Sequence, residues 1–281
     1  MTSPMTIESL LRESASQLKT ISPTPQLDAE VLLMFALNAD RVFLYTYGNR
    51  MLSKTEQELF DKCLKRRLNG EPIAYITGQK AFWSLAFKVS PAVLIPRPET
   101  ELLVECVLEN LPAADTKISV LELGTGSGII AVCLAKYRPL WSITAVDINQ
   151  EALAIAKENE HTLLTNSPIQ WLHSNWFESI PNQTFSVIIS NPPYIADNDL
   201  HLQSLSFEPQ NALVSGHDGL DAIRTIVTQS LSYLEDEGQL FIEHGYQQAD
   251  AVYSLFQQAG FRNIILFYDI SGQPRVTTGK K

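Results

Sequence analysis

Short apolar segments alternate with amphipathic segments after about residue 117, and this alternation constrains the fold more than any other feature of the chain. Branched and aromatic side chains predict strands at 118–123, 142–147, 169–172, 185–190, 238–243 and 262–269. Apolar residues at helical spacing predict helices near 127–137, 150–160, 218–234 and 246–259. Such alternation is typical of an α/β, Rossmann-like fold, in which helices cover both faces of a mostly parallel sheet. Residues 272–278 predict one further strand, at an edge of that sheet.

The first 75 residues carry a helical pattern instead. Apolar residues recur there three and four positions apart, as they do in amphipathic helices. Ser53 and Glu56 form a capping-box pattern at the start of one helix, and Asn69-Gly70 predicts its end. These residues therefore predict a small helical bundle in front of the α/β part.

A connecting segment separates these two parts. Residues 80–96 change to a period of two, which predicts a short β-hairpin around Ser90-Pro91. Two prolines flank Arg97 and stiffen the connection, and Pro98 is well placed to open the next helix. We therefore expect three parts, namely a helical domain at 1–78, a hairpin linker at 79–97 and an α/β domain at 98–281.

The composition is that of a globular protein that can bury a sizeable core. Of the 281 residues, 45% are hydrophobic and 19% are charged. No stretch approaches the roughly 20 apolar residues that span a bilayer, and the first residues lack the pattern of a signal peptide. The three cysteines have neither metal-ligand spacing nor an even number for disulfides, so we expect the cytoplasm and no bound metal. A net charge of −10 argues against a nucleic-acid substrate.

Four residues, Asn191-Pro192-Pro193-Tyr194, follow the apolar segment 185–190. A polar amide, two rigid prolines and an aromatic ring at the end of a buried strand make a small receptor for a planar amino group. The same residues also suit a plain turn, because asparagine and proline both favour turns. The tetrapeptide alone does not decide between these two interpretations.

A glycine-rich loop follows the first strand of the α/β part. It reads Gly124-Thr-Gly-Ser-Gly128, and glycine there lets the backbone turn tightly and approach a ligand in the crevice at the strand end. A dinucleotide-binding loop has a third glycine in G-x-G-x-x-G spacing. Ile129 stands at that position, which disfavours NAD-dependent oxidoreduction. Glu122, just before the loop, suits a ligand that carries an amino group and a positive charge better than it suits a pyrophosphate.

Two further strand ends supply candidate contacts to a nucleoside. Asp147 lies about twenty residues beyond the glycines, where an acidic side chain can accept hydrogen bonds from both ribose hydroxyls. The alternative is an acid at a helix N-terminus. Asn175 can bond the edge of an adenine and Trp176 can cover its ring, although a Trp-Phe pair is otherwise ordinary core.

Together these motifs resemble class I S-adenosylmethionine-dependent methyltransferases, and Asn-Pro-Pro-Tyr narrows the resemblance to those that methylate amide or exocyclic amino nitrogens. The chain is similar over nearly its full length to one family, the release factor glutamine methyltransferases of the HemK type. The segments that carry this resemblance are Gly78–Phe82, Leu94–Glu101, Gly124–Gly128, Asn191–Ile195, Phe207–Leu213 and Gly216–Asp221.

The resemblance implies a helical substrate-binding domain, a hairpin linker and a seven-stranded methyltransferase domain. It implies S-adenosyl-L-methionine as cofactor and, as methyl acceptor, the glutamine in the Gly-Gly-Gln loop of peptide chain release factors. Carried over residue by residue, the expected cofactor contacts are Gly124, Thr125, Gly126, Ser127, Gly128, Asp147, Asn175, Trp176 and Asn191. The residues expected to hold the glutamine and act in catalysis are Asn191, Pro192, Pro193 and Tyr194.

The chain departs from the family pattern at two places. Asn175 stands where many relatives carry aspartate, but both side chains offer an oxygen to an adenine amino group. Trp83-Ser84 replaces an aromatic–glycine pair that is common in the hairpin. The second departure concerns the hairpin and leaves the chemistry unaffected.

Several alternatives stay open at this point. Arg97 could bind the release factor, or it could form a structural salt bridge with a carboxylate of the catalytic domain. The substrate could instead be a glutamine of a ribosomal protein or an exocyclic amino group in nucleic acid. A non-catalytic cofactor-binding or adaptor protein is disfavoured, because it needs no amide receptor beside a methyl donor. We expect a monomer. We expect no membrane partner and no direct nucleic-acid substrate.

Overall fold

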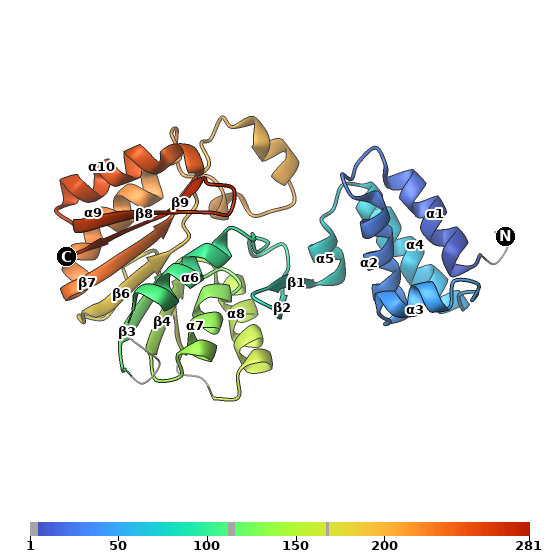
Figure 1. Cartoon of the computed structure of the whole chain (residues 1–281), viewed down its shortest axis with the longest axis horizontal. Helices are drawn as coiled ribbons and strands as arrows, with labels where there is room; N and C mark the ends of the chain where they lie inside the picture. Colours follow the sequence, from blue (N-terminus) through green and yellow to red (C-terminus); the bar gives the residue numbers. More distant parts are fainter. Residues whose placement is uncertain (1–4, 112–115, 167–168) are drawn as a thin grey trace. The chain divides into compact units, whose positions relative to one another are not determined.

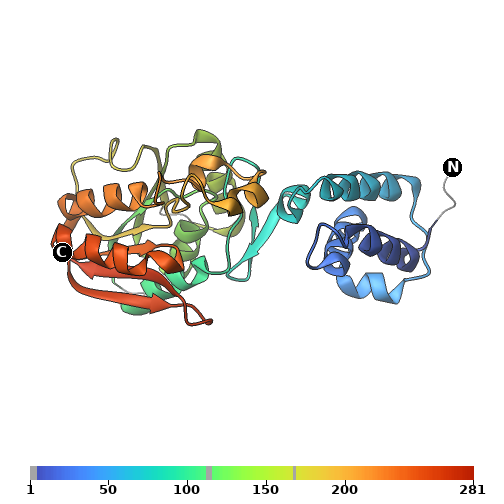
Figure 2. The ribbon, with the colours of Figure 1, turned by 90° about the horizontal axis from the view of Figure 1, so that it is seen from above.

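The computed structural model describes residues 5–111, 116–166 and 169–281. The chain divides into two compact units, Met1–Gln79 and Lys80–Lys281. The first unit is helical, and the second is a seven-stranded sheet covered by helices (Figure 1). Figure 2 shows both units from above. The α/β class with a preceding helical part is therefore confirmed.

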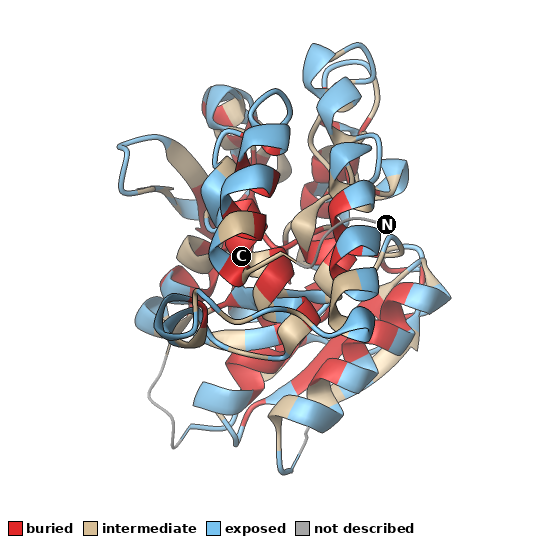
Figure 3. Cartoon of the chain, turned by 90° about the vertical axis from the view of Figure 1, so that its right-hand side faces the viewer, coloured by how far each residue is buried: buried red, intermediate tan, exposed pale blue. Residues whose placement is uncertain are grey.

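Apolar side chains on one side of each helix form the core of the first unit. Leu18, Leu32 and Phe60 are fully buried there in one cluster, and in the ribbon the buried positions alternate with exposed ones along each helix (Figure 3). The capping box is present, since Glu56 N donates to Ser53 Oγ at 3.3 Å and Ser53 N donates to Glu56 Oε2 at 2.7 Å. The helices of this unit are α1 (Ile7–Leu18), α2 (Pro25–Leu37), α3 (Arg41–Thr46), α4 (Lys54–Leu68) and α5 (Ile73–Thr77).

The hairpin consists of β1 (Gln79–Phe82) and β2 (Leu85–Lys88), and the prediction that it turns at Ser90-Pro91 is wrong. Its turn is Trp83-Ser84, where both residues have positive φ, +50° and +61°. Positive φ at both central positions is the usual requirement of a two-residue hairpin loop. Ser90 begins a separate turn after β2, in which Val93 N donates to the Ser90 carbonyl at 3.1 Å.

We expect Ser84→Gly to stabilise the second unit by up to about 1 kcal/mol. A left-handed residue other than glycine costs about 1–2 kcal/mol, part of which is offset by the greater freedom of glycine in the unfolded chain. Ser84 is exposed, so little packing is lost. Equilibrium urea unfolding measures the effect, with Ser84→Ala as the control that keeps the strain. A Ser84→Gly protein less stable than Ser84→Ala would contradict this account of the turn.

The sheet of the second unit has the order β5-β4-β3-β6-β7-β9-β8. The first five strands in this order are parallel, and β9 runs antiparallel to both of its neighbours. The chain order reverses between β3 and β6, and ligands of open α/β sheets bind at such a switch point, beyond the carboxyl ends of the strands. The strands are β3 (Ser119–Leu123), β4 (Ser142–Asp147), β5 (Ile169–His173), β6 (Phe185–Ser190), β7 (Leu234–Glu243), β8 (Arg262–Tyr268) and β9 (Pro274–Lys280).

Helices cover both faces of this sheet. One face carries α6 (Thr100–Asn110), α7 (Ile129–Tyr137) and α8 (Gln150–Leu163), and the other carries α9 (Asp221–Tyr233) and α10 (Ala249–Ala259) (Figure 1). The short 3₁₀ helices are η1 (Leu200–Leu205), η2 (Gln210–Ala212) and η3 (Tyr246–Gln248). Across the described ranges, no helix has both the length and the apolar character that a membrane span requires.

The last strand does not lie at an edge, contrary to the prediction. β9 is inserted between β7 and β8, and β8 forms the edge. Thr277 and Thr278 are fully buried there, with partners for their hydroxyls. His244 Nε2 lies 2.8 Å from Thr277 Oγ1, and Thr278 Oγ1 donates to the Leu240 carbonyl at 2.8 Å. A strand rich in threonine resembles a half-exposed edge in sequence, but these hydrogen bonds let it occupy the interior.

Candidate active site

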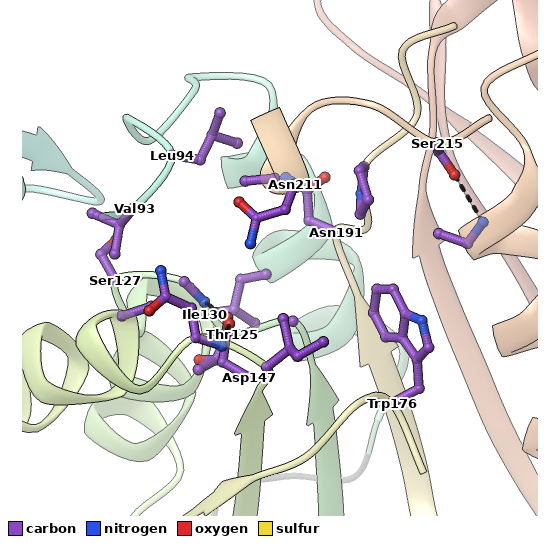
Figure 4. A pocket seen from close by; sticks show the side chains of 18 of the residues that line it. Val93, Leu94, Thr125, Ser127, Ile130, Asp147, Trp176, Asn191, Asn211 and Ser215 are labelled. Atoms are coloured by element: carbon purple, nitrogen blue, oxygen red, sulfur yellow. Dashed lines mark hydrogen bonds between the residues drawn. The ribbon is translucent and has the colours of Figure 1, made fainter. Parts of the chain in front are cut away.

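A cavity of about 460 Å³ lies at the carboxyl ends of β3, β4 and β6 in the second unit (Figure 4). Its size is in the range of small-molecule and cofactor sites. The structure brings most of the predicted site residues together there, although they come from distant parts of the chain. Those that line the cavity are Arg97, Gly124, Thr125, Gly126, Ser127, Asp147, Asn175, Trp176, Asn191 and Pro193.

Three predicted residues do not line the cavity, namely Gly128, Pro192 and Tyr194. Gly128 lies at the start of α7 with φ +80°, and its α-carbon faces α8 and β5 so closely that a β-carbon would lie 2.9 Å from Ala156 Cβ and 3.1 Å from Trp171. Pro192 is buried.

Glu122 lies beneath the glycine loop and also does not line the cavity. Its Oε2 accepts hydrogen bonds from Thr125 Oγ1 at 2.9 Å and from Ala131 N at 3.0 Å, so it ties the loop to the start of α7. Burial raises the pKa of Glu122 to about 8, although these two donors oppose the shift. Glu122 therefore acts on a ligand only through the loop, and not by direct contact with an amino group.

Asp147 ends β4 and faces the glycine loop. Its Oδ2 accepts from Gly126 N at 2.8 Å and its Oδ1 accepts from Asn149 N at 2.8 Å. Burial raises the pKa of the Asp147 carboxyl, and the backbone donors oppose this shift. Each carboxylate oxygen has a further lone pair for a ligand. The residue thus both orders the start of α8 and presents an acceptor to the cavity.

Asn175 and Trp176 follow β5 and form another wall of the cavity. Asn175 Nδ2 donates to Glu178 Oε1 at 2.7 Å, so its amide oxygen is the group that it can offer to a ligand amino group. Trp176 has φ +49°, and a β-carbon on Gly124 would lie 3.4 Å from its ring. Ser174 Oγ donates to the Trp176 carbonyl at 2.9 Å and supports this uncommon backbone conformation.

Asn191 is the first residue after β6, and its side chain points into the cavity (Figure 4). Its Nδ2 donates to Thr100 Oγ1 at 2.9 Å. The amide oxygen therefore faces away from Thr100 and is an acceptor for a group inside the cavity. Thr100 begins α6 and is itself buried.

Tyr194 packs against the apolar core between the sheet and helices α9 and α10. Its hydroxyl and its carbonyl both form hydrogen bonds. Its hydroxyl donates to Glu243 Oε1 over 3.4 Å, and its carbonyl accepts from Gln248 Nε2 at 3.0 Å. Burial and the nearby Glu243 charge raise the pKa of the phenol, so Tyr194 stays protonated. The expectation that its ring stacks on a substrate amide stays a prediction.

Arg97 forms the structural salt bridge that was one of its two expected roles. Its Nη2 lies 2.6 Å from Glu208 Oε1, and Ile95 N donates to Glu208 Oε2 at 3.1 Å. Glu208 is almost completely buried. Arg97 also lines the cavity, so it holds the segment after η1 against the cavity mouth. Binding of a release factor by Arg97 stays a prediction.

Two segments of the lining were not predicted. Residues 92–96 come from the linker, and residues 211–225 come from the region before and at the start of α9. Ser215 Oγ accepts from Ala222 N at 2.8 Å and fixes this second segment (Figure 4). Both segments overlap motifs that carry the family resemblance but had no role assigned to them. Those motifs were the signal from which the two segments could have been predicted.

Solved structures of methyltransferases share this fold. One is a methyltransferase from Pyrococcus furiosus, with 18% identity and a TM-score of 0.54 over 79% of this chain and 98% of that one. Another is a 16S rRNA methyltransferase of T. thermophilus in complex with AdoMet and guanosine, with 19% identity and a TM-score of 0.53 over 72% and 49% of the two chains. The methyltransferase small domain family matches residues 98–208. Fold and cavity together define a methyltransferase.

The sequence relatives narrow this class further. The PrmC N-terminal domain family matches residues 9–78. Proteins named release factor glutamine methyltransferase are 44% identical in Coxiella burnetii, over 99% of both chains, and 47% identical in Pseudomonas aeruginosa, over 98% of both. The Escherichia coli protein of that name is 43% identical over 96% of this chain and 97% of its own. The chain belongs to the release factor glutamine methyltransferase family.

Proposed function

We propose that this protein transfers a methyl group from S-adenosyl-L-methionine to the side-chain amide nitrogen of a glutamine, the one in the Gly-Gly-Gln loop of peptide chain release factors. The observation that carries the proposal is the Asn191 amide. Its N–H side is bound to Thr100, and its oxygen faces the cavity that the glycine loop and Asp147 also line. The names of the relatives support glutamine as the acceptor.

The cavity residues fit this cofactor. Asp147 offers carboxylate lone pairs to ribose hydroxyls, and the amide oxygen of Asn175 is free to accept from an adenine amino group. Ile148 and Trp176 add apolar surface for a flat ring. Gly124 and Gly126 have positive φ and carry no side chain that would obstruct a ligand close to the backbone.

The chemical difficulty lies with the glutamine amide, because its nitrogen lone pair is delocalised into the carbonyl. The cofactor supplies a strongly electrophilic methyl group on a sulfonium. Asn191 and the Pro192 carbonyl accept the two N–H bonds of the amide and aim the nitrogen at that methyl. Both acceptors also stabilise the positive charge that develops on the nitrogen. Pro193 fixes the backbone so that this arrangement exists before the substrate binds.

The helical first unit serves in this proposal as the substrate-binding domain. The four-residue receptor recognises the amide plane of one side chain and nothing of the protein that carries it. Selection of a release factor over other proteins therefore needs a second surface. The match of residues 9–78 to a domain family of its own supports a dedicated role for this unit.

We expect Asp147→Ala to weaken S-adenosylmethionine binding by about 100-fold. The variant loses two hydrogen bonds to a charged acceptor, on the order of 3 kcal/mol together. Isothermal calorimetry measures this affinity. Asp147→Asn keeps the shape but not the charge, and it should lie between the wild type and Asp147→Ala. An unchanged affinity in Asp147→Ala would remove the ribose role.

One labelling experiment tests the proposed function. The full chain is incubated with methyl-labelled cofactor and, in separate reactions, a purified release factor, ribosomal protein or DNA. Mass spectrometry then locates the label. We expect label on the glutamine of the Gly-Gly-Gln loop and none on a release factor in which that glutamine is alanine. Label confined to ribosomal protein or to DNA would overturn the proposal.

A further inference from the structure

Glu243 is a buried carboxylate that the proposed chemistry does not use. It is the last residue of β7, it is only 1% exposed, and within the described part of the chain its Oε2 has no hydrogen-bond partner. Burying a charge is costly unless the charge is fully paired. In the parallel register Ser190 pairs with Ile242, so Asn191 and Glu243 directly follow a matched pair at the same edge of the sheet.

Thr100 connects these two residues. It is 1% exposed, and its Oγ1 accepts the hydrogen bond from Asn191 Nδ2 at 2.9 Å. A hydroxyl has a single hydrogen to donate. The Glu243 carboxyl is a candidate acceptor for it, and the Thr100 hydroxyl opposes the rise of the Glu243 pKa. The Thr100 hydroxyl thus stands between the Asn191 amide, which donates to it, and the Glu243 carboxyl.

The other end of the tetrapeptide reaches the same carboxylate. Tyr194 donates to Glu243 Oε1 over 3.4 Å. Tyr194, the last residue of the receptor, therefore contacts Glu243 directly, and Asn191, the first, is separated from it by the Thr100 hydroxyl. This arrangement brings the motifs at 94–101 and 191–195 to the end of β7, although the three segments lie far apart in the sequence.

We propose that Glu243 is a positioning residue that, through the Thr100 hydroxyl, fixes the Asn191 amide with its oxygen toward the substrate nitrogen. This inference rests on the proposed function. It adds the residue that determines which way the Asn191 amide points. A carboxylate at position 243 can only accept, so it favours a Thr100 hydroxyl that donates to it and keeps its lone pairs for Asn191 Nδ2. A donor at position 243 would let the Thr100 hydrogen bond the Asn191 amide oxygen instead, which would turn the Asn191 NH₂ toward the substrate NH₂, where two donors would oppose each other.

The same arrangement predicts a dependence on pH. Burial raises the pKa of Glu243 to about 7; Thr100, Arg275 and Tyr194 oppose the shift, and the charge of Glu99 adds to it. Below that pH the carboxyl is protonated and can itself donate to Thr100. The turnover number should therefore fall as the pH drops through about 7. The adjacent His244 is buried with a lowered pKa, so it stays neutral over this range.

The test compares three variants of the full chain with the wild type. Glu243→Gln keeps the shape but supplies a donor, Thr100→Val keeps the shape but removes the hydroxyl, and Thr100→Ser retains the hydroxyl. We expect kcat to fall at least about tenfold in Glu243→Gln and in Thr100→Val, with calorimetric cofactor affinity within about threefold of wild type. Thr100→Ser should restore most of the activity that Thr100→Val loses.

The ratio of wild-type kcat to Glu243→Gln kcat, measured from pH 6 to pH 8, is the second readout. It should rise with pH, since only the wild type carries the titrating carboxyl. Wild-type turnover by Glu243→Gln, or a ratio that does not change with pH, would overturn the inference. If the wild type methylates a different amide or amino substrate, the proposed function fails, but the same comparison on that substrate still tests Glu243.

Discussion

Replacing Asn191 with alanine is expected to lower kcat by on the order of 10³-fold, while the affinity for S-adenosylmethionine falls only a few-fold. Loss of one preorganised hydrogen-bond partner in a water-excluded site typically costs 10²–10³ in kcat. The effect should reach the upper end of that range because Asn191 also aims the nitrogen. Cofactor binding rests mainly on other residues, including the loop Gly124–Gly128 and Asp147.

Single-turnover methylation of a release factor and calorimetry of the cofactor measure the two effects separately. Asn198→Ala is the matched control, since Asn198 lies in the same loop, is exposed and does not line the cavity. We expect this control to keep wild-type kcat. The proposed role of Asn191 could not stand if Asn191→Ala turned over normally, or if both variants lost activity equally.

Most strands and helices could be predicted because their signals are local. The six strands predicted from apolar runs all occur, and five of them both start and end within one residue of the expected position, as in β4 at Ser142–Asp147. A buried parallel strand needs only a short apolar run with polar ends, and a surface helix needs only its 3.6-residue period. Both are properties of neighbouring residues.

The errors occurred where pairing between distant segments decides the structure. Trp83-Ser84 has neither glycine nor asparagine, the residues that favour positive φ, and Ser90-Pro91 carries the stronger local turn signal. The place of β9 depends on partners for Thr277 and Thr278 that lie more than thirty positions away, as in the hydrogen bond from Thr278 to Leu240. No periodicity in residues 274–280 records those partners.

In the candidate site, too, some residues could be predicted from the sequence and others could not. Asp147, Asn191 and the glycine loop could be located because each follows an apolar strand, and parallel strands end at one edge of the sheet. Their supports could not be located in this way. Thr100 and Glu208 lie 91 and 111 positions from the residues they hold, Asn191 and Arg97. Contacts between such distant residues leave no periodic pattern in the sequence. Their residues stand out only as part of motifs that no nearby helix or strand explains.

The second large effect is expected in stability, with Gly128→Ala lowering the free energy of unfolding by about 2–5 kcal/mol. A left-handed alanine costs about 1–2 kcal/mol, and forcing a methyl group into a packed interior typically adds 1–3 kcal/mol. The new methyl would lie 2.9 Å from Ala156 Cβ and 3.2 Å from Ala156 Cα, which is backbone and cannot rotate away. In a dinucleotide-binding loop, the third glycine of G-x-G-x-x-G allows the helix to pack closely. Gly128 has the same role here, one position earlier in the sequence.

Gly272→Ala separates the two costs. Gly272 has φ +74°, close to the +80° of Gly128, but a β-carbon there would meet no atom of the described residues within 4 Å. We therefore expect Gly272→Ala to cost only about 1–2 kcal/mol, the backbone contribution alone. Urea unfolding of both variants, followed by tryptophan fluorescence, gives the difference. Equal losses would show that backbone strain, and not the contact between the glycine loop and α8, explains the glycine at position 128.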